Sequence, residues 1–162
     1  MIKKFNNKEK DSYLFFILLF ISLFLSNTGI LGITDSRIMP NYFIALVIAF
    51  IITNKANLNL YKLMILGLIV DLLAGQLLGQ HALIFITIFV LSFLANKLLV
   101  IKTEIQLSTL SIFLISNSFF ILWVTSQSHD IFRSPNLVIL QGLLTFFAYL
   151  ITKLIIVKFS LK

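Results

Sequence analysis

Six long apolar stretches run along the chain, separated by short polar segments. They cover residues 13–31, 40–53, 62–79, 82–96, 105–125 and 136–157. Stretches of this length are typical of membrane-spanning helices, because a helix needs about 20 apolar residues to cross the hydrocarbon core of a bilayer. The second and fourth stretches are shorter, so we expect their helices to extend into the flanking segments. The pattern predicts an all-α, polytopic membrane protein with six transmembrane helices in a single domain over residues 1–162.

The basic residues alternate between the segments that connect these stretches. Eleven lysines fall in one set of segments: the N-terminus, the connection from the second stretch to the start of the third at Lys62, the connection between the fourth and fifth, and the C-terminal part from Lys153 onward. Arg37 and Arg133 occupy the other connections. Short cytoplasmic loops retain Lys and Arg, so this distribution predicts that both termini are cytoplasmic. The first stretch follows a lysine-rich start but lacks an Ala-x-Ala exit, which favours an uncleaved anchor over a signal peptide.

Composition narrows the class further. The chain is 59% hydrophobic and 12% charged, with a mean hydropathy of +1.04, and a soluble domain of 162 residues could not bury that much apolar surface. The net charge of +7 is spread between apolar runs, which indicates membrane topology and some attraction to anionic lipid rather than nucleic-acid binding. The chain has no Cys and two His, so we expect no metal site and no cofactor.

The third stretch carries a single carboxylate, Asp71. Three glycines lie at four-residue spacing from it along the chain: Gly67, Gly75 and Gly79. On one helix these residues would form a stripe with little side-chain bulk, which suits close approach by another helix. The first interpretation is therefore a packing or interaction seam that includes Gln80 at its outer end. The alternative is that residues 75–80 already belong to the outer turn, with Asp71 near its rim.

A buried carboxyl group needs a hydrogen-bond partner in lipid. Polar residues gather in the fifth stretch, and we expect Asn117 to be the partner of Asp71, while the neighbouring serines serve in helix packing. Catalysis is not expected. His129 and Asp130 are adjacent but lack an identifiable nucleophile, and the chain has neither a second membrane carboxylate nor the Gly-x-Ser-Gly of a rhomboid-like protease.

Two motifs resemble a known family. Residues 67–83, GLIVDLLAGQLLGQHAL, are similar to the signature of the MreD family, the membrane protein of the bacterial rod-shape-determining system. That signature consists of Gly-Leu, an apolar pair, Asp-Leu-Leu, then Gly, then Leu-Gly. An apolar helix that begins with a small residue follows. Residues 39–42 resemble the Pro-Asp or Pro-Asn element that opens the second span of the family. The chain length and the multi-span layout also agree.

The resemblance implies a non-enzymatic scaffold or regulatory subunit of the cell-elongation complex in the bacterial inner (cytoplasmic) membrane, which supports peptidoglycan synthesis and cell shape. Its implied partners are MreC and, through MreC or directly, MreB, RodA and a class B penicillin-binding protein. In that setting, six residues would form an assembly surface or an internal seam: Gly67, Asp71, Gly75, Gly79, Gln80 and Asn117.

The family also resembles in fold the substrate-binding membrane subunits of energy-coupling-factor vitamin transporters, which have six helices. This resemblance implies the alternative function of a small-molecule transporter subunit. Such subunits typically carry Ala-x-x-x-Ala on the first helix for docking to the energising partner. The stretch over residues 13–31 contains no Ala, which disfavours this alternative.

Overall fold

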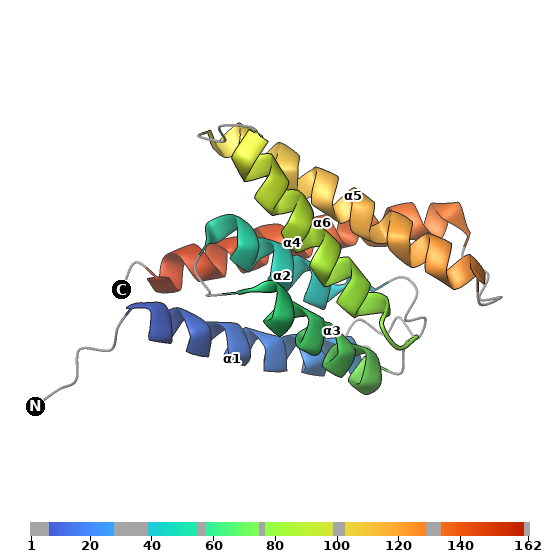
Figure 1. Ribbon diagram of the computed structural model, residues 1–162, viewed down its shortest axis with the longest axis horizontal. Coiled ribbons are helices and arrows are strands. Elements are labelled where there is room, and N and C mark those ends of the chain that lie inside the picture. The colour runs from blue at the N-terminus through green and yellow to red at the C-terminus, as the bar shows by residue number, and fades with distance from the viewer. Residues whose placement is uncertain are drawn as a thin grey trace, which may run out of the picture.

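The computed structural model describes residues 7–27, 39–54, 58–74, 77–98, 103–128 and 134–160. These residues form six α-helices and no strand, which confirms the all-α prediction (Figure 1). The helices are α1 (Asn7–Asn27), α2 (Tyr42–Thr53), α3 (Leu60–Ala74), α4 (Gln80–Leu98), α5 (Glu104–Ser128) and α6 (Pro135–Ser160). Within the described ranges, α4, α5 and α6 are each long and apolar enough to cross a membrane.

The main correction to the expected helix bounds concerns the third helix. It was expected to reach residue 79, but α3 ends at Ala74, and α4 begins at Gln80. The chain turns at residues 77–79, where Gly79 adopts a φ of +93°. That left-handed conformation is strained for any residue with a Cβ atom, so glycine is required there to end the turn. Residues 77–79, Leu-Leu-Gly, therefore form a turn, although they are as apolar as the helix that precedes them.

Successive helices run in alternating directions, so the start of α1 and the end of α6 lie at the same end of the bundle (Figure 1). The short helix α2 occupies the centre and contacts α1, α4, α5 and α6. All of its residues from Phe43 to Phe50 are buried. A helix that is apolar on every side must be enclosed by other helices or by lipid, and here other helices enclose it. Phe15 of α1 packs edge-on against Phe50, with the ring centroids 5.0 Å apart.

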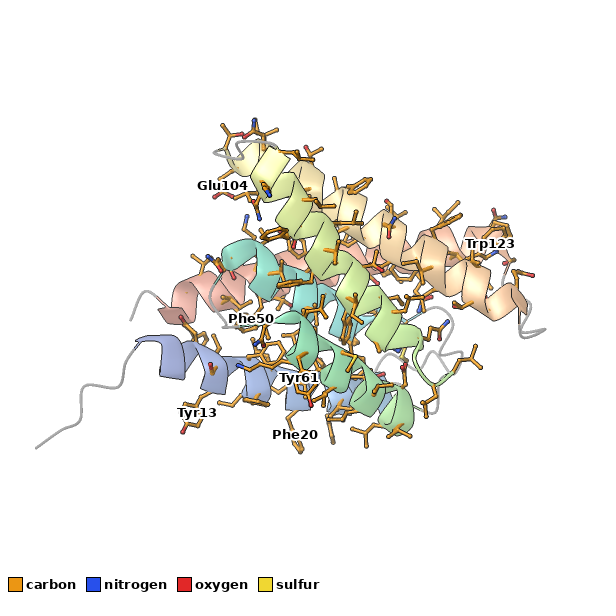
Figure 2. The ribbon with its side chains drawn as sticks, viewed as in Figure 1. Tyr13, Phe20, Phe50, Tyr61, Glu104 and Trp123 are labelled. Atoms are coloured by element: carbon orange, nitrogen blue, oxygen red, sulfur yellow. The ribbon has the colours of Figure 1, made fainter. Side chains whose placement is uncertain are left out.

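The outer surface of the bundle is rich in large apolar side chains. Phe20 of α1 is 72% exposed, and it points away from the other helices, whereas Phe50 lies inside (Figure 2). Tyr61 of α3 and Phe147 of α6 are also exposed. Water would not favour such a surface, because exposed apolar patches on soluble proteins rarely exceed a few hundred Å². The surface is that of a protein surrounded by lipid.

The most extensive helix contact is between α3 and α4. Gly67 lies at its centre: a Cβ atom added there would overlap the backbone of Ala82 and lie 2.8 Å from the carbonyl carbon of His81. The two backbones therefore touch, which only glycine permits at this position. This contact sets the distance between α3 and α4, and so determines where the last turn of α3 meets the first turn of α4.

Candidate functional site

Helices α2 and α3 are short, with 12 and 15 residues, or about 18 and 22 Å at 1.5 Å per residue. The helices α5 and α6 have 25 and 26 residues. The first N–H groups of a helix have no partner within it, and a buried backbone group without a hydrogen bond destabilises the fold. The starts of α2 and α4 therefore need polar partners from elsewhere in the protein. Side chains near one end of the bundle supply them.

Asp71, in the last turn of α3, caps the start of α4. Its carboxylate accepts hydrogen bonds from the backbone N–H of Gly79 at 2.8 Å and from that of His81 at 3.0 and 3.2 Å. The ring of His81 adds a contact from Nδ1 to Oδ1 at 2.7 Å. Asp71 is 1% exposed. Because a carboxylate at a helix N-terminus satisfies free N–H groups and interacts favourably with the helix dipole, Asp71 fixes the angle between α3 and α4.

His81 connects this cap to the start of α2. It is 3% exposed, and its Nε2 lies 3.1 Å from Nδ2 of Asn41. Asn41 is the N-cap of α2, and its Oδ1 accepts the N–H of Ile44 at 3.1 Å. Since that N–H can only donate, the amide of Asn41 must turn its NH₂ group toward His81. Nε2 is then an acceptor, which assigns the ring as neutral with its hydrogen on Nδ1, donated to Asp71.

Further hydrogen bonds extend from these residues to α5 and α6. The backbone N–H of Asn41 donates to Oγ1 of Thr145 at 2.9 Å, and Nε2 of Gln141 donates to the carbonyl of Met39 at 2.9 Å. Nε2 of Gln80 donates to Oγ1 of Thr125. We call the side chains that join helix ends in this way the polar network: Asn41, Asp71, Gln80, His81, Thr125, Gln141 and Thr145.

Comparison with known proteins gives a family for this fold and site. A family described as rod shape-determining protein MreD matches the chain over residues 9–159. The chain belongs to the MreD family. Neither the curated proteins nor the solved structures that were searched gave a match. The MreD family comprises membrane-associated proteins that take part in determining rod shape, and it is not a known family of enzymes.

Four residues of the stretch that resembles the MreD signature, residues 67–83, have a structural role. Asp71 caps α4, Gly79 forms the turn, Gln80 reaches α5, and His81 reaches α2. Both nitrogens of the His81 ring are bonded to protein side chains, so neither is presented to a substrate. The arrangement joins helices, and it resembles an internal lock more than a reaction centre.

The expected glycine stripe is only partly present. Gly67 lies in the α3–α4 contact, but Gly79 is in the turn and not on the helix of Asp71, so the single-helix stripe is wrong for Gly79. Gly75 lies outside the described residues. The structure agrees with the alternative interpretation for Gly79, which lies in the outer turn, whereas Gln80 begins α4 and Asp71 is buried.

The expected partner of Asp71 is also corrected. Among the described residues, the hydrogen bonds of Asp71 run to Gly79 and His81, and Asn117 is a partly exposed residue of α5 that makes none of them. Asn117 was chosen because a buried carboxyl group needs a polar partner on a neighbouring helix. The polar partner is instead the start of α4, the next helix in the chain, where two backbone N–H groups act as donors.

Sequence reasoning missed Asn41, Thr125, Gln141 and Thr145 as site residues, and it treated His81 only as part of the motif. One signal could have identified Asn41. It follows Pro40 and precedes an apolar run, which is a typical N-cap position. The other three look like ordinary polar residues of a membrane helix. Only the tertiary fold shows that Gln141 and Thr145 contact the segment before α2 and that Thr125 contacts Gln80.

A matched pair of threonines on α6 tests the network. Thr145→Val removes the acceptor for the Asn41 N–H, and we expect it to lower the free energy of unfolding by about 1–2 kcal/mol, since a partly buried donor loses its partner. Thr152 bonds only the carbonyl of Ala148 in its own helix, so Thr152→Val should change that free energy by less than about 0.5 kcal/mol. SDS-induced unfolding of the purified protein measures both. Equal effects would contradict a cross-helix role for Thr145.

Proposed function

We propose that this chain is a non-enzymatic scaffold subunit of the bacterial cell-elongation complex in the inner membrane. It would bind MreC and, through MreC or directly, MreB, RodA and a class B penicillin-binding protein. The observation that carries the proposal is membership of the MreD family over residues 9–159. The apolar outer surface and the buried polar network support a rigid membrane platform that holds partners in place.

We further propose that all six helices cross the membrane with both termini in the cytoplasm. The alternating helix directions in Figure 1 support this layout. They bring the described lysines Lys62, Lys97 and Lys158 to the same end of the bundle as the start of α1. Lysine-rich ends are cytoplasmic in membrane proteins. The polar network would then lie toward the outer face, where α2 begins and α3 ends.

In this proposal the polar network is an internal lock and does not itself contact a partner. The burial of Asp71 and His81 and the use of their polar atoms within the protein support this role. The lock would hold α3 against the start of α4, α4 against α5, and the segment before α2 against α4 and α6, because its hydrogen bonds join these parts of the chain. A defined helix arrangement is what a scaffold offers to its partners.

Affinity purification of the tagged full-length chain from the bacterium that encodes it, in mild detergent, tests the function. Identification of co-purifying proteins by mass spectrometry should recover MreC, and depletion of the chain should convert rods into round cells. The control is the variant Thr152→Val, which should retain both properties. Rod shape that persists after depletion, or purification without MreC, would contradict the proposal. The alternative function as a transporter subunit stays a prediction, and recovery of ATPase subunits in this experiment would favour it.

A further inference from the structure

We propose that the polar network is a proton-responsive latch, in which proton uptake by His81 releases the N-terminal cap of α2. The proposal concerns regulation of the network described above, and it does not depend on which partners the scaffold binds. It rests on the direction of each hydrogen bond around His81. Those directions admit the neutral ring and oppose the charged one.

The directions are set by backbone groups that cannot reverse. On one side of the ring, the N–H groups of Gly79 and His81 both donate to Asp71, so this carboxylate is an acceptor for Nδ1–H as well. On the other side, the N–H of Ile44 donates to Oδ1 of Asn41, so Nδ2 of Asn41 faces Nε2 of His81. Between these two anchors, one arrangement of hydrogens satisfies every group.

A second proton on His81 would disrupt this arrangement. The new Nε2–H would face the NH₂ group of Asn41 at 3.1 Å, which places two donors opposite each other. Rotation of the amide by a half turn would give Nε2–H an acceptor, but it would place the NH₂ group against the N–H of Ile44. Either the hydrogen bond between His81 and Asn41 breaks, or Asn41 no longer caps α2. The contact with Asp71 would remain and become an ion pair.

Among the described residues, no charged side chain other than Asp71 lies beside His81. On α3 the facing group is Asp71, and Lys62 lies at the opposite end of that helix. On α2 and α4 the flanking groups are the rings of Phe43 and Phe85, with centroids 6.2 and 5.9 Å away. The network residues of α5 and α6 are all uncharged: Thr125, Gln141 and Thr145. The described charges of the remaining helix ends lie at the other end of the bundle: Asp11, Lys97, Glu104, Lys153 and Lys158.

Asn41 is the network residue through which a proton would reach His81. Asn41 is partly exposed, and its Nδ2 lies 3.1 Å from Nε2 of the buried His81 ring.

The test combines ¹⁵N NMR of the imidazole rings with amide hydrogen exchange, on the full-length protein in detergent micelles. The chain has two histidines, so His129→Gln leaves His81 as the one imidazole signal. At about pH 7.5 we expect a neutral ring with its hydrogen on Nδ1, and a charged ring on acidification toward about pH 5. As the ring becomes charged, the Ile44 amide should exchange about five- to tenfold faster relative to that of Ile48. Ile48 lies one turn further along α2 and corrects for the intrinsic effect of pH.

Two variants separate the latch from general acid destabilisation. His81→Gln cannot take up a proton, so the relative exchange of Ile44 should not depend on pH. Asn41→Asp can cap Ile44 with one oxygen and accept Nε2–H with the other, so its His81 should already be charged at about pH 7.5 without loss of the cap. If His81→Gln fails to fold, Asn41→Asp still decides. The proposal is overturned if His81 stays neutral down to about pH 5, if Ile44 exchange does not follow its charge, or if Asn41→Asp responds to acid like the wild type.

Discussion

Replacement of Gly67 by alanine is expected to separate α3 from α4 and to lower the free energy of unfolding by about 3 kcal/mol. The added Cβ atom would overlap the backbone of Ala82, and a backbone cannot move aside as the end of a flexible side chain can. The shift would also pull Asp71 away from the N–H groups that it caps. SDS-induced or thermal unfolding of the purified variant in detergent measures the loss.

Gly142→Ala is the matched control. A Cβ atom at this position of α6 would lie 3.7 Å from a ring carbon of Phe119, which is an ordinary contact. Alanine favours helix formation over glycine by about 1 kcal/mol, so this variant should be as stable as the wild type or more so. The same gain in helix propensity applies at Gly67, and the difference between the two variants therefore isolates packing. A Gly67→Ala variant as stable as Gly142→Ala would contradict the backbone contact between α3 and α4.

Replacement of Asp71 by leucine is expected to cost about 3–5 kcal/mol, because each buried donor left without a partner costs about 1–3 kcal/mol. Three donors would lose their acceptor: the backbone N–H groups of Gly79 and His81, and Nδ1–H of His81. Asp71→Asn retains one acceptor oxygen and should cost about 1–3 kcal/mol. Unfolding in SDS, measured on both purified variants, shows which of them has lost more free energy of unfolding.

Asp71→Lys gives a further comparison. A lysine has only donors, so it would oppose three N–H groups at a site that is nearly closed to solvent, and we expect it to be worse than Asp71→Asn. A lysine variant with wild-type stability would show that residue 71 faces water or lipid headgroups. A leucine variant as stable as the asparagine variant would show that capping by the carboxylate contributes little.

The number, type and order of the helices could be predicted from the sequence, because each apolar stretch is long and separated from the next by polar residues. The end of α3 could not. Residues 60–79 are apolar almost throughout, and hydropathy does not distinguish Leu-Leu in a helix from Leu-Leu in a turn. The feature that ends the helix is the positive φ of Gly79. The sequence does not reveal it, because Gly79 follows Gly67 and Asp71 at multiples of four residues and so looks like part of the same helix face.

The chemistry of the site was visible only in part. The need of Asp71 for a partner follows from its apolar surroundings, yet the identity of that partner depends on the turn at residues 77–79, which precedes α4. The bond between Asn41 and His81 joins residues 40 positions apart, and no periodicity in the sequence connects them. What the sequence does contain is two separate motifs, and the structure shows that they meet at this bond.

A double-mutant cycle between Asp71 and His81 tests the central claim most directly, which is that the signature residues form a lock within the chain itself. The free energy of unfolding is measured for the wild type, Asp71→Asn, His81→Gln and the double variant, each purified without partners. The account predicts that both single variants are destabilised and that the double variant loses at least about 1 kcal/mol less than the sum of the two. Additive losses, or single variants as stable as the wild type, would contradict it and would assign these residues to a contact outside the chain.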